Sequence, residues 1–177
     1  KLNPLLTKDF DYHLALEQIA QVPLEPRHAS RLLVLDRATS VLQHKSFWDL
    51  PDFLDSGDLL VLNNTRVIPA RIFAQKLPGR GQVELLLLRK EKEMSWEVLV
   101  GGSGMRTGRQ VDAGDGLMGI VAAELDGARR IIDCNQPVEP HLEKIGHVPL
   151  PPYIHTELKD TERYQTVYAS WPGSAAA

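Results

Sequence analysis

The stretch from about residue 67 to residue 146 alternates short apolar segments with glycine-containing turns, and this pattern limits the possible folds more than any other feature of the chain. Short apolar segments bounded by turn residues are typical of β-strands. We expect strands at residues 70–75, 82–89, 96–100, 117–123 and 129–134, with turns at 78–81, 101–108, 112–116 and 126–127. Strands at this spacing predict a small closed barrel or a sandwich.

The residues before this stretch have a mixed texture. Residues 9–21 carry apolar side chains at mostly helical spacing and predict a short amphipathic helix. Residues 31–36 and 41–44 predict a hairpin, and residues 47–53 predict a short helical or irregular connection. Residues 58–62 are apolar on both faces, and we interpret them as a strand that is buried from both sides.

The β-rich stretch is followed by a helix and then by a stiff extended segment. Residues 139–145 predict a short helix that ends at Gly146, where we expect a left-handed cap residue. Residues 149–153 contain three prolines. Each proline fixes its own φ and biases the preceding residue away from the helical region, so this segment is expected to act as a return linker.

Charge and composition exclude several classes of protein. The chain has 20 Lys and Arg against 23 Asp and Glu, and this net charge of −3 disfavours binding of nucleic acid by bulk positive charge. The lone Cys134 excludes a disulfide framework and fits a reducing compartment, which predicts a cytoplasmic protein. No apolar run is long enough to span a bilayer, and the first residues lack the apolar block of a signal peptide, so no membrane partner is expected.

Two local groups of cations lie within the electrically balanced β-rich stretch. Arg71, Lys76 and Arg80 lie near its first turn, and Arg106 and Arg109 flank a glycine-rich loop. Taken one at a time, these groups favour a solvated surface. The loop matches neither of the common glycine patterns that cradle phosphate, so we interpret it as a barrel loop.

Four polar residues directly follow the predicted strand at 58–62, and they form the most informative segment. Asn63 and Asn64 have amides that both donate and accept, as recognition of a base or ribose requires, while Thr65 adds a hydroxyl and Arg66 a planar fork for carboxylate or phosphate. Ligands often bind where a buried strand ends. The alternative is that the two asparagines shape a turn and that Arg66 forms a structural ion pair.

A second polar group follows the return linker. Arg163 and Gln165 are good ligands for anions or bases, and Tyr164 can stack on a ring or a cation. The alternative is a surface turn with a buried tyrosine.

The six histidines show no spacing typical of metal ligands, so no metal site is expected. His147 lies between Gly146 and the proline-rich segment and is a weak candidate for proton transfer, with a capping or packing role as the alternative. No nucleophile motif of a hydrolase is present.

Several long runs resemble one known family. Residues 9–12, 19–21, 30–37, 57–71, 146–154 and 162–169 are similar, in order, to the S-adenosylmethionine:tRNA ribosyltransferase-isomerases of queuosine biosynthesis. The resemblance extends over nearly the whole chain, and the runs at 57–71 and 146–154 make it specific.

The resemblance implies both a fold and an activity. The implied fold is a mixed α/β domain, residues 1–66 with 150–177, into which a small all-β barrel domain, residues 67–149, is inserted. The implied enzyme transfers the ribosyl part of S-adenosylmethionine to the 7-aminomethyl-7-deazaguanine base of tRNA and isomerises it, giving epoxyqueuosine-tRNA, adenine and methionine. S-adenosylmethionine is then a co-substrate, tRNA is the partner, and neither a cofactor nor a metal is required.

The resemblance also suggests which residues form the substrate cleft. Asn63, Asn64, Thr65 and Arg66 are expected to line it with Arg71 beside them, while Tyr153, Arg163, Tyr164 and Gln165 reach it from the return segment. His147 is the weak candidate for the catalytic base. Two positions depart from the family: Ala15 stands where a proline usually follows leucine, and residues 101–104 lack the usual lysine, which removes one expected phosphate contact.

In the family, the segment that corresponds to residues 173–177 is followed by a further segment roughly as long as this whole chain. The resemblance therefore implies that the 177 residues are truncated and inactive alone. The competing hypothesis is a non-catalytic RNA-binding module in which the barrel contacts RNA.

Overall fold

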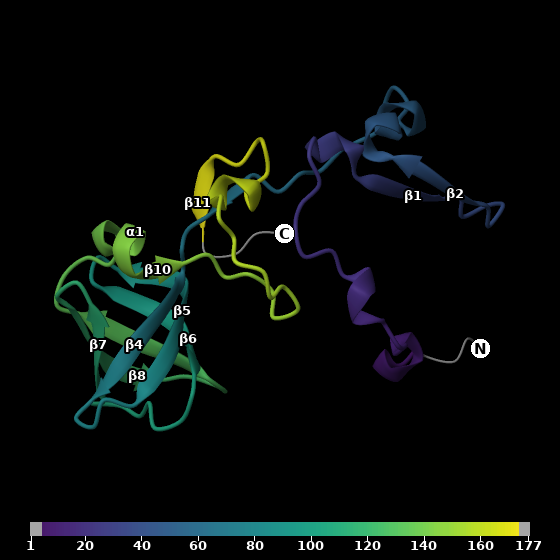
Figure 1. Ribbon diagram of the computed structural model, residues 1–177. Helices are drawn as coiled ribbons and strands as arrows, with labels where there is room; N and C mark the ends of the chain where they lie inside the picture. The colour runs from purple at the N-terminus through teal and green to yellow at the C-terminus, as the bar shows by residue number, and fades with distance from the viewer. Residues whose placement is uncertain (1–4, 174–177) are drawn as a thin grey trace. The chain divides into compact units, whose positions relative to one another are not determined.

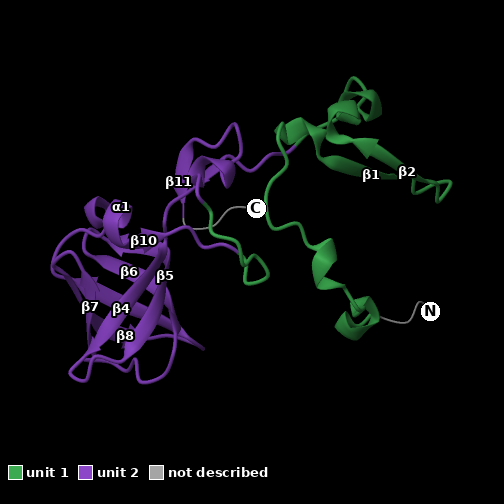
Figure 2. Ribbon diagram, in the orientation of Figure 1, with its two compact units in different colours: residues 1–60, 151–158 green, residues 61–150, 159–177 purple. Residues whose placement is uncertain are grey.

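The computed structural model describes residues 5–173, and its strands and helices are drawn in Figure 1. The chain divides into two compact units, which Figure 2 colours separately. One unit holds the chain up to residue 60 together with residues 151–158, and the other holds residues 61–150 and the chain from residue 159. The second unit therefore contains both the β-rich stretch and most of the predicted site residues. The domain division predicted at residues 66/67 and 149/150 stays a prediction.

A closed barrel of six antiparallel strands makes up most of the second unit (Figure 1). The order around the ring is β4, β5, β6, β9, β8 and β7; β4 pairs with β7 to close it, and the short β10 pairs with the start of β4. The strands are β4 Arg71–Leu77, β5 Gln82–Lys92, β6 Ser95–Gly101, β7 Gln110–Gly114, β8 Leu117–Glu124, β9 Arg129–Cys134 and β10 Gly146–His147. The predicted barrel is confirmed, and each of the five predicted strands is present.

Burial alternates with period two along β4 and β5, although some of the outward-facing residues are apolar as well. Ile72 and Ala74 of β4 point into the core, as do Val83 and Leu85 of β5, whereas Phe73 lies on the outer face. Successive strand side chains point to opposite faces, so this alternation fixes the register of each strand against the core.

The strand β7 was not predicted, and the predicted turn at 112–116 is too long, because residues 112–114 belong to β7 and only Asp115 and Gly116 form the turn. Both turn residues have positive φ, as a tight two-residue hairpin turn requires, and the pairing of β7 with β8 is irregular between Asp112 and Gly114. Only Val111 and Ala113 of β7 face the core. Two apolar residues beside a glycine-rich loop are too weak a pattern to predict a strand.

The predicted helix at 139–145 is confirmed as η5 (Glu139–His141) continued by α1 (Leu142–Ile145), but the predicted cap is wrong. Gly146 has φ −87° and ψ 151°, which is extended backbone. Its glycine is required by space, because a Cβ there would lie 2.2 Å from the Pro69 main-chain oxygen. The chain thus passes from α1 directly into β10.

The first unit contains short elements only. The predicted hairpin is confirmed as β1 and β2, and the predicted connection at 47–53 is the 3-10 helix η4. The elements are η1 Thr7–Phe10, η2 Leu16–Gln18, η3 Arg27–Ala29, β1 Arg31–Leu35, β2 Leu42–Ser46 and η4 Phe47–Phe53.

Two predictions for this part of the chain are wrong. Residues 9–21 form no continuous helix, since only η1 and η2 are helical and Leu14 and Leu16 are exposed. A short helix is marginal without an apolar face to bury, and none is buried here. Residues 58–62 are neither a strand nor buried: Leu59 is 88% exposed and Val61 81%. No described strand pairs with this run.

The α/β character of the predicted fold is not shown. Outside the barrel, the described residues form the β1–β2 hairpin, a second two-stranded sheet and 3-10 turns, and α1 is the one α-helix within residues 5–173. In the same range, no helix is long and apolar enough to cross a membrane.

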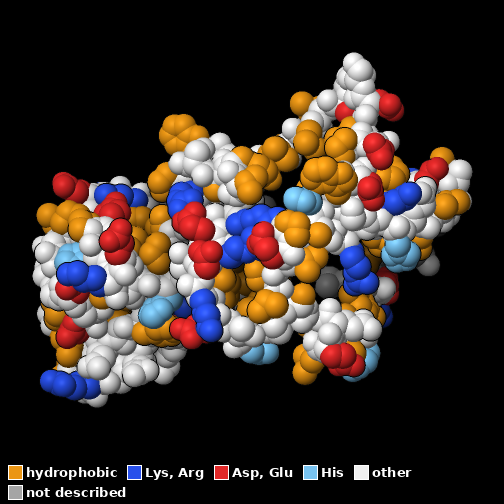
Figure 3. Space-filling view, turned by 45° about the horizontal axis from the view of Figure 1, so that its top comes forward, with side chains coloured by type: hydrophobic (Ala, Val, Ile, Leu, Met, Phe, Trp, Pro, Cys, Tyr) orange, Lys and Arg blue, Asp and Glu red, His pale blue; other side chains and the backbone are white. Residues whose placement is uncertain are grey.

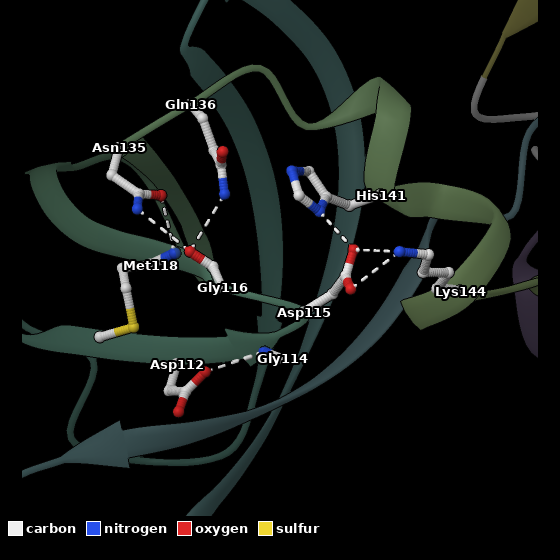
Figure 4. A network of polar contacts seen from close by, with 9 residues as sticks. All are labelled: Asp112, Gly114, Asp115, Gly116, Met118, Asn135, Gln136, His141 and Lys144. Atoms are coloured by element: carbon white, nitrogen blue, oxygen red, sulfur yellow. Dashed lines mark hydrogen bonds and ion pairs between the residues drawn. The ribbon is translucent and has the colours of Figure 1, made fainter.

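The carboxylate of Asp115 fixes η5 and α1 to the barrel (Figure 4). One Asp115 oxygen lies 2.8 Å from His141 Nδ1, and the other accepts a hydrogen bond of 3.0 Å from Lys144 Nζ. These two contacts, His141 first, hold the pKa of Asp115 below its ordinary value of 3.8. On the other side of the same turn, Asn135 and Gln136 both donate to the Gly116 main-chain oxygen.

The lowered pKa of Asp115 predicts an acid-dependent loss of stability. A carboxylate whose pKa is depressed by folding stabilises the folded state above its unfolded pKa and loses that contribution as pH falls through the folded value. We expect Asp115→Asn to be less stable than wild type near neutral pH and to approach it as pH falls below 3.8. Urea midpoints over a pH series measure this. A difference between the Asp115 variant and wild type that stays constant over the pH series would contradict the assignment.

Candidate functional site

Two segments far apart in the sequence come together at β3 (Thr65–Val67) and β11 (Trp171–Gly173), which pair in parallel (Figure 1). The main-chain oxygen of Asn64 accepts hydrogen bonds from Ser170 N at 2.9 Å and from Trp171 N at 3.3 Å. The polar residues 63–66 therefore lie beside residues 170–173, which follow the second predicted polar group at 163–165. We call residues 63–67 and 160–173 the β3–β11 cluster.

Gln165 joins the two halves of the cluster. Its Oε1 accepts from Val67 N at 2.8 Å, and its Nε2 donates to the Val67 main-chain oxygen at 2.9 Å. The side chain thus pairs with one residue of β3 as a neighbouring strand would. Gln165 is only 6% exposed and Val67 4%, so the contact supplies hydrogen-bond partners to a buried peptide N–H and C=O that water does not reach. The geometry gives Gln165 a positioning role toward β3.

Arg66 and Glu162 form an ion pair across the cluster. Both side chains are largely open to solvent, so the pair contributes little to stability. Glu162 lies in η6 (Thr161–Arg163), whose first turn is capped by Asp160 through a 3.0 Å hydrogen bond from Glu162 N. This cap fixes the backbone of η6 at Glu162. It thereby positions the Glu162 carboxylate that pairs with the Arg66 guanidinium.

The two asparagines differ in what they do. Asn63 Oδ1 accepts from Thr65 N at 2.8 Å, an Asx turn that directs the chain into β3. The structural alternative considered for this segment, a turn plus an ion pair of Arg66, is thus present. The side chain of Asn64 is exposed and makes no hydrogen bond within residues 5–173, so its amide is available to a ligand.

Arg71 and His147 face each other across the β4–β10 pair. Directly opposite residues of antiparallel strands share a face, which here is the outer face of the barrel. Arg71 Nε lies 2.9 Å from Glu84 Oε1. The exposed His147 ring packs on Phe73 at a centroid distance of 5.1 Å. The guanidinium of Arg71, the carboxylate of Glu84 and the imidazole of His147 therefore lie near one another on this face. Arg71 itself is four residues after the end of β3.

The remaining predicted residues are distributed over both units. Arg163 and Tyr164 are half-buried at and just after η6, within the cluster. Tyr153 belongs to the first unit, where its main-chain oxygen accepts a 3.0 Å hydrogen bond from Gln21 Nε2. Gln21 Oε1 also accepts from His155 N at 2.8 Å, so one glutamine side chain fixes the return segment on both sides of residue 154.

A groove of about 580 Å³ lies in the second unit beside the cluster. Apolar residues form most of its wall, and Glu139 and Glu143 supply carboxylates. Its lining comes from the residues just after β3, from β5, β6 and β11, and from η5 and α1, and comprises Ile68, Pro69, Leu88, Arg89, Lys90, Trp96, Glu139, Leu142, Glu143, Pro172 and Gly173. Among the described residues, no group of three or more His, Cys, Asp or Glu side chains is placed to hold a metal ion.

Sequence reasoning missed the acidic partners at this site. Glu84, Asp160 and Glu162 orient Arg71, η6 and Arg66, respectively. Glu162 lies in one of the runs that carry the family resemblance, next to Arg163. Its partner could not be found by spacing, because 96 residues separate it from Arg66.

Comparisons with known proteins agree on one family. The family described as "Queuosine biosynthesis protein" matches residues 7–177. The chain is 49% identical over 173 residues to the S-adenosylmethionine:tRNA ribosyltransferase-isomerase of Symbiobacterium thermophilum and 47% identical over 175 residues to that of Clostridioides difficile. These alignments cover 96% and 97% of this chain and 51% of each relative, so the chain spans about half their length. A crystal structure of S-adenosylmethionine tRNA ribosyltransferase from Thermotoga maritima is 37% identical, with a TM-score of 0.40 over 77% of this chain and 48% of that one.

The double hydrogen bond of Gln165 predicts a large effect on stability. Gln165→Ala leaves the buried N–H and C=O of Val67 without partners, which costs about 1–3 kcal/mol of unfolding free energy. Glu162→Ala removes only an exposed ion pair and should cost less than about 1 kcal/mol. Urea unfolding of both variants measures the difference. Equal losses for the two would contradict the positioning role of Gln165.

Proposed function

The chain belongs to the queuosine biosynthesis protein family, and we propose that it is part of an S-adenosylmethionine:tRNA ribosyltransferase-isomerase acting in the cytoplasm. The observation that carries this proposal is the 44–49% identity, over 96–97% of the chain, to three relatives of that name. The aligned region covers 96–97% of the chain and so includes the β3–β11 cluster as well as the barrel, and the proposal therefore includes the candidate site.

The proposed reaction joins S-adenosylmethionine, as co-substrate, to tRNA. The ribosyl part is transferred to the aminomethyl nitrogen of 7-aminomethyl-7-deazaguanine and isomerised, and adenine and methionine leave. The sulfonium acidifies the neighbouring C–H and departs as the methionine thioether, so the reaction needs a base, a site that receives adenine and contacts that hold the unstacked base. It needs no metal and no separate cofactor.

Each candidate residue can serve one of these needs. The exposed amide of Asn64 can pair with a base edge, and Arg66, drawn toward Glu162, can bind a phosphate or carboxylate. Asn63 and Gln165 act by shaping and holding β3. Thr65, Arg163 and Tyr164 complete the substrate contacts from within the cluster.

Two further residues outside the cluster are proposed to take part in the reaction. His147 is the candidate base, since its exposed ring is fixed on Phe73 opposite Arg71. Tyr153 is proposed to contribute its ring from the return segment.

The rest of the enzyme is proposed to cover the apolar run at 59–62. Four consecutive apolar side chains at this run are each more than half exposed. Figure 3 shows further hydrophobic side chains on the surface, and exposed Val167 and Trp171 add to them from the cluster itself. Exposed apolar surface of this extent is typical of an interface that another part of the protein buries.

Adenine release tests the proposed activity. The complete protein that carries this chain is expected to release adenine from S-adenosylmethionine only when tRNA containing the aminomethyl base is present, measured by chromatography. Residues 1–177 alone are expected to release none, because part of the cleft and its cover are missing. Tight tRNA binding by the complete protein with no adenine release would support the RNA-binding module instead.

A variant of Arg66 tests the candidate site. Arg66→Ala removes the planar fork and should lower kcat/KM for adenine release about tenfold or more. Lys92→Ala, an exposed cation at the end of β5, is the matched control and should leave the rate unchanged. If Arg66→Ala keeps the wild-type kcat/KM, Arg66 does not contact substrate.

A further inference from the structure

The structure brings together two groups of cations that the sequence keeps apart. Residues 76–81 and 101–109 hold Lys76, Arg80, Arg106 and Arg109, and neither loop contains an Asp or Glu. A hollow of about 290 Å³ lies between the two loops, lined from one side by Lys76, Pro78, Gly79 and Gly81 and from the other by Ser103, Gly104 and Arg109. We call these two loops and the hollow the barrel tip; they lie at the end of β4 opposite β10 (Figure 1).

The loop at 101–109 is anchored. It crosses from β6 to β7, which are not neighbours in the ring, and so passes over the mouth of the barrel. Met105 fills that mouth and is 2% exposed, while its main-chain oxygen accepts a 2.7 Å hydrogen bond from Arg130 Nε. The exposed Arg106 follows directly. The cations of the tip are therefore presented on fixed backbone.

Two of the cations connect the loops and still have donors left. Lys76 Nζ donates to the Ser103 main-chain oxygen at 3.1 Å, and Arg109 donates to the main-chain oxygens of Gly104 and Leu77 at 3.3 and 3.2 Å. An ammonium has three N–H donors and a guanidinium five, so both retain donors toward the hollow. None of the four tip cations is paired with a carboxylate within the described part of the chain.

The nearby carboxylates are paired with other arginines. Asp126 forms an ion pair with Arg129, and Glu124 lies 3.6 Å from Arg130 and accepts a 3.2 Å hydrogen bond from Thr107 N of the tip loop. Glu97, on β6, is also paired with Arg129. The tip thus holds four cations that form no ion pair within the described residues, in a chain whose net charge is −3.

The chemistry of the hollow suits phosphate rather than a base. Its lining has no aromatic side chain on which a base could stack, and glycines at 79 and 104 have open space where a Cβ would be, so backbone can approach a ligand closely. Cations and backbone without stacking groups are typical of contacts to the sugar–phosphate backbone.

We propose that the barrel tip binds the phosphate backbone of the substrate tRNA, at a distance from the reacting base. This inference rests on the proposed function. The strand β4 separates the tip from Arg71, which lies beside the candidate site, by roughly 20 Å at about 3.3 Å per residue. That distance exceeds a single nucleotide step, so the tip contacts the backbone several nucleotides from the modified base and orients the RNA across the outer face of β4.

Binding of tRNA by the complete protein tests the proposal. The double variant Arg80→Glu/Arg106→Glu reverses the two exposed charges of the tip. It should raise the Kd for tRNA about tenfold or more at ~0.1 M salt, because binding with fewer phosphate contacts releases fewer counterions from the RNA. The slope of log affinity against log salt should shrink by roughly 1.4–1.8, the value for two phosphates. The KM for S-adenosylmethionine, and kcat at saturating tRNA, should stay at wild-type values.

Matched controls make the outcome specific. Lys92→Glu makes the same kind of change at the opposite end of β5 and should leave tRNA affinity unchanged, while Arg80→Gln/Arg106→Gln should give an intermediate loss. An unchanged Kd and salt slope for the double reversal, or an equal loss for Lys92→Glu, would overturn the proposal while adenine release still supports the activity. If the wild type releases no adenine, the proposed function fails, and the binding measurement alone decides whether the tip binds RNA.

Discussion

The pairing of β4 on both of its edges is the constraint on which the rest of the second unit depends. One edge pairs with β5, and the other pairs first with β10 and then with β7. Without the β7 contact the sheet would have two open edges, and a closed barrel is the arrangement that removes them. Closure also fixes what lies at each end of the strand: Arg71 and His147 at its start, and Lys76 at its finish.

The sequence predicted the parts of the fold in which local pattern and burial agree. In β4 and β5 short apolar runs between turns predicted strands, and the structure buries every second residue of these strands in the barrel core. The failures at residues 9–21 and 58–62 have the opposite cause. Their patterns are apolar enough to predict buried elements, but burial needs a neighbour, and no described residue covers Leu59 or Val61. A local apolar pattern predicts that a surface will be buried, but it does not identify the residues that cover it.

The nearness of the two polar segments agrees with the sequence prediction, while their assignment to a substrate site stays a prediction. Asn63 to Arg66 and Arg163 to Gln165 were expected to share a site, and the β3–β11 pair brings them together. Their roles depend on contacts across about a hundred residues, which no spacing rule describes. Gln165 has the chemistry of a base-reading side chain, yet its amide is engaged by a buried peptide group of Val67. Some polar side chains are engaged by buried backbone groups and others remain for a ligand. The structure is required to tell the two kinds apart.

Net charge is a poor guide to RNA binding in a chain built this way. The value of −3 averages over surfaces that the fold keeps separate, and the Debye length of about 8–10 Å at physiological salt limits how far one surface influences another. At the barrel tip the neighbouring carboxylates pair with Arg129 and Arg130, and none of them forms an ion pair with Lys76, Arg80, Arg106 or Arg109 in the described part of the chain. The ion pairs of Arg129 and Arg130 contribute little to stability, but they engage the carboxylates nearest the tip. They thereby determine which cations are left without an acidic partner. Under the proposed function, a local surface of this kind is enough to orient the RNA.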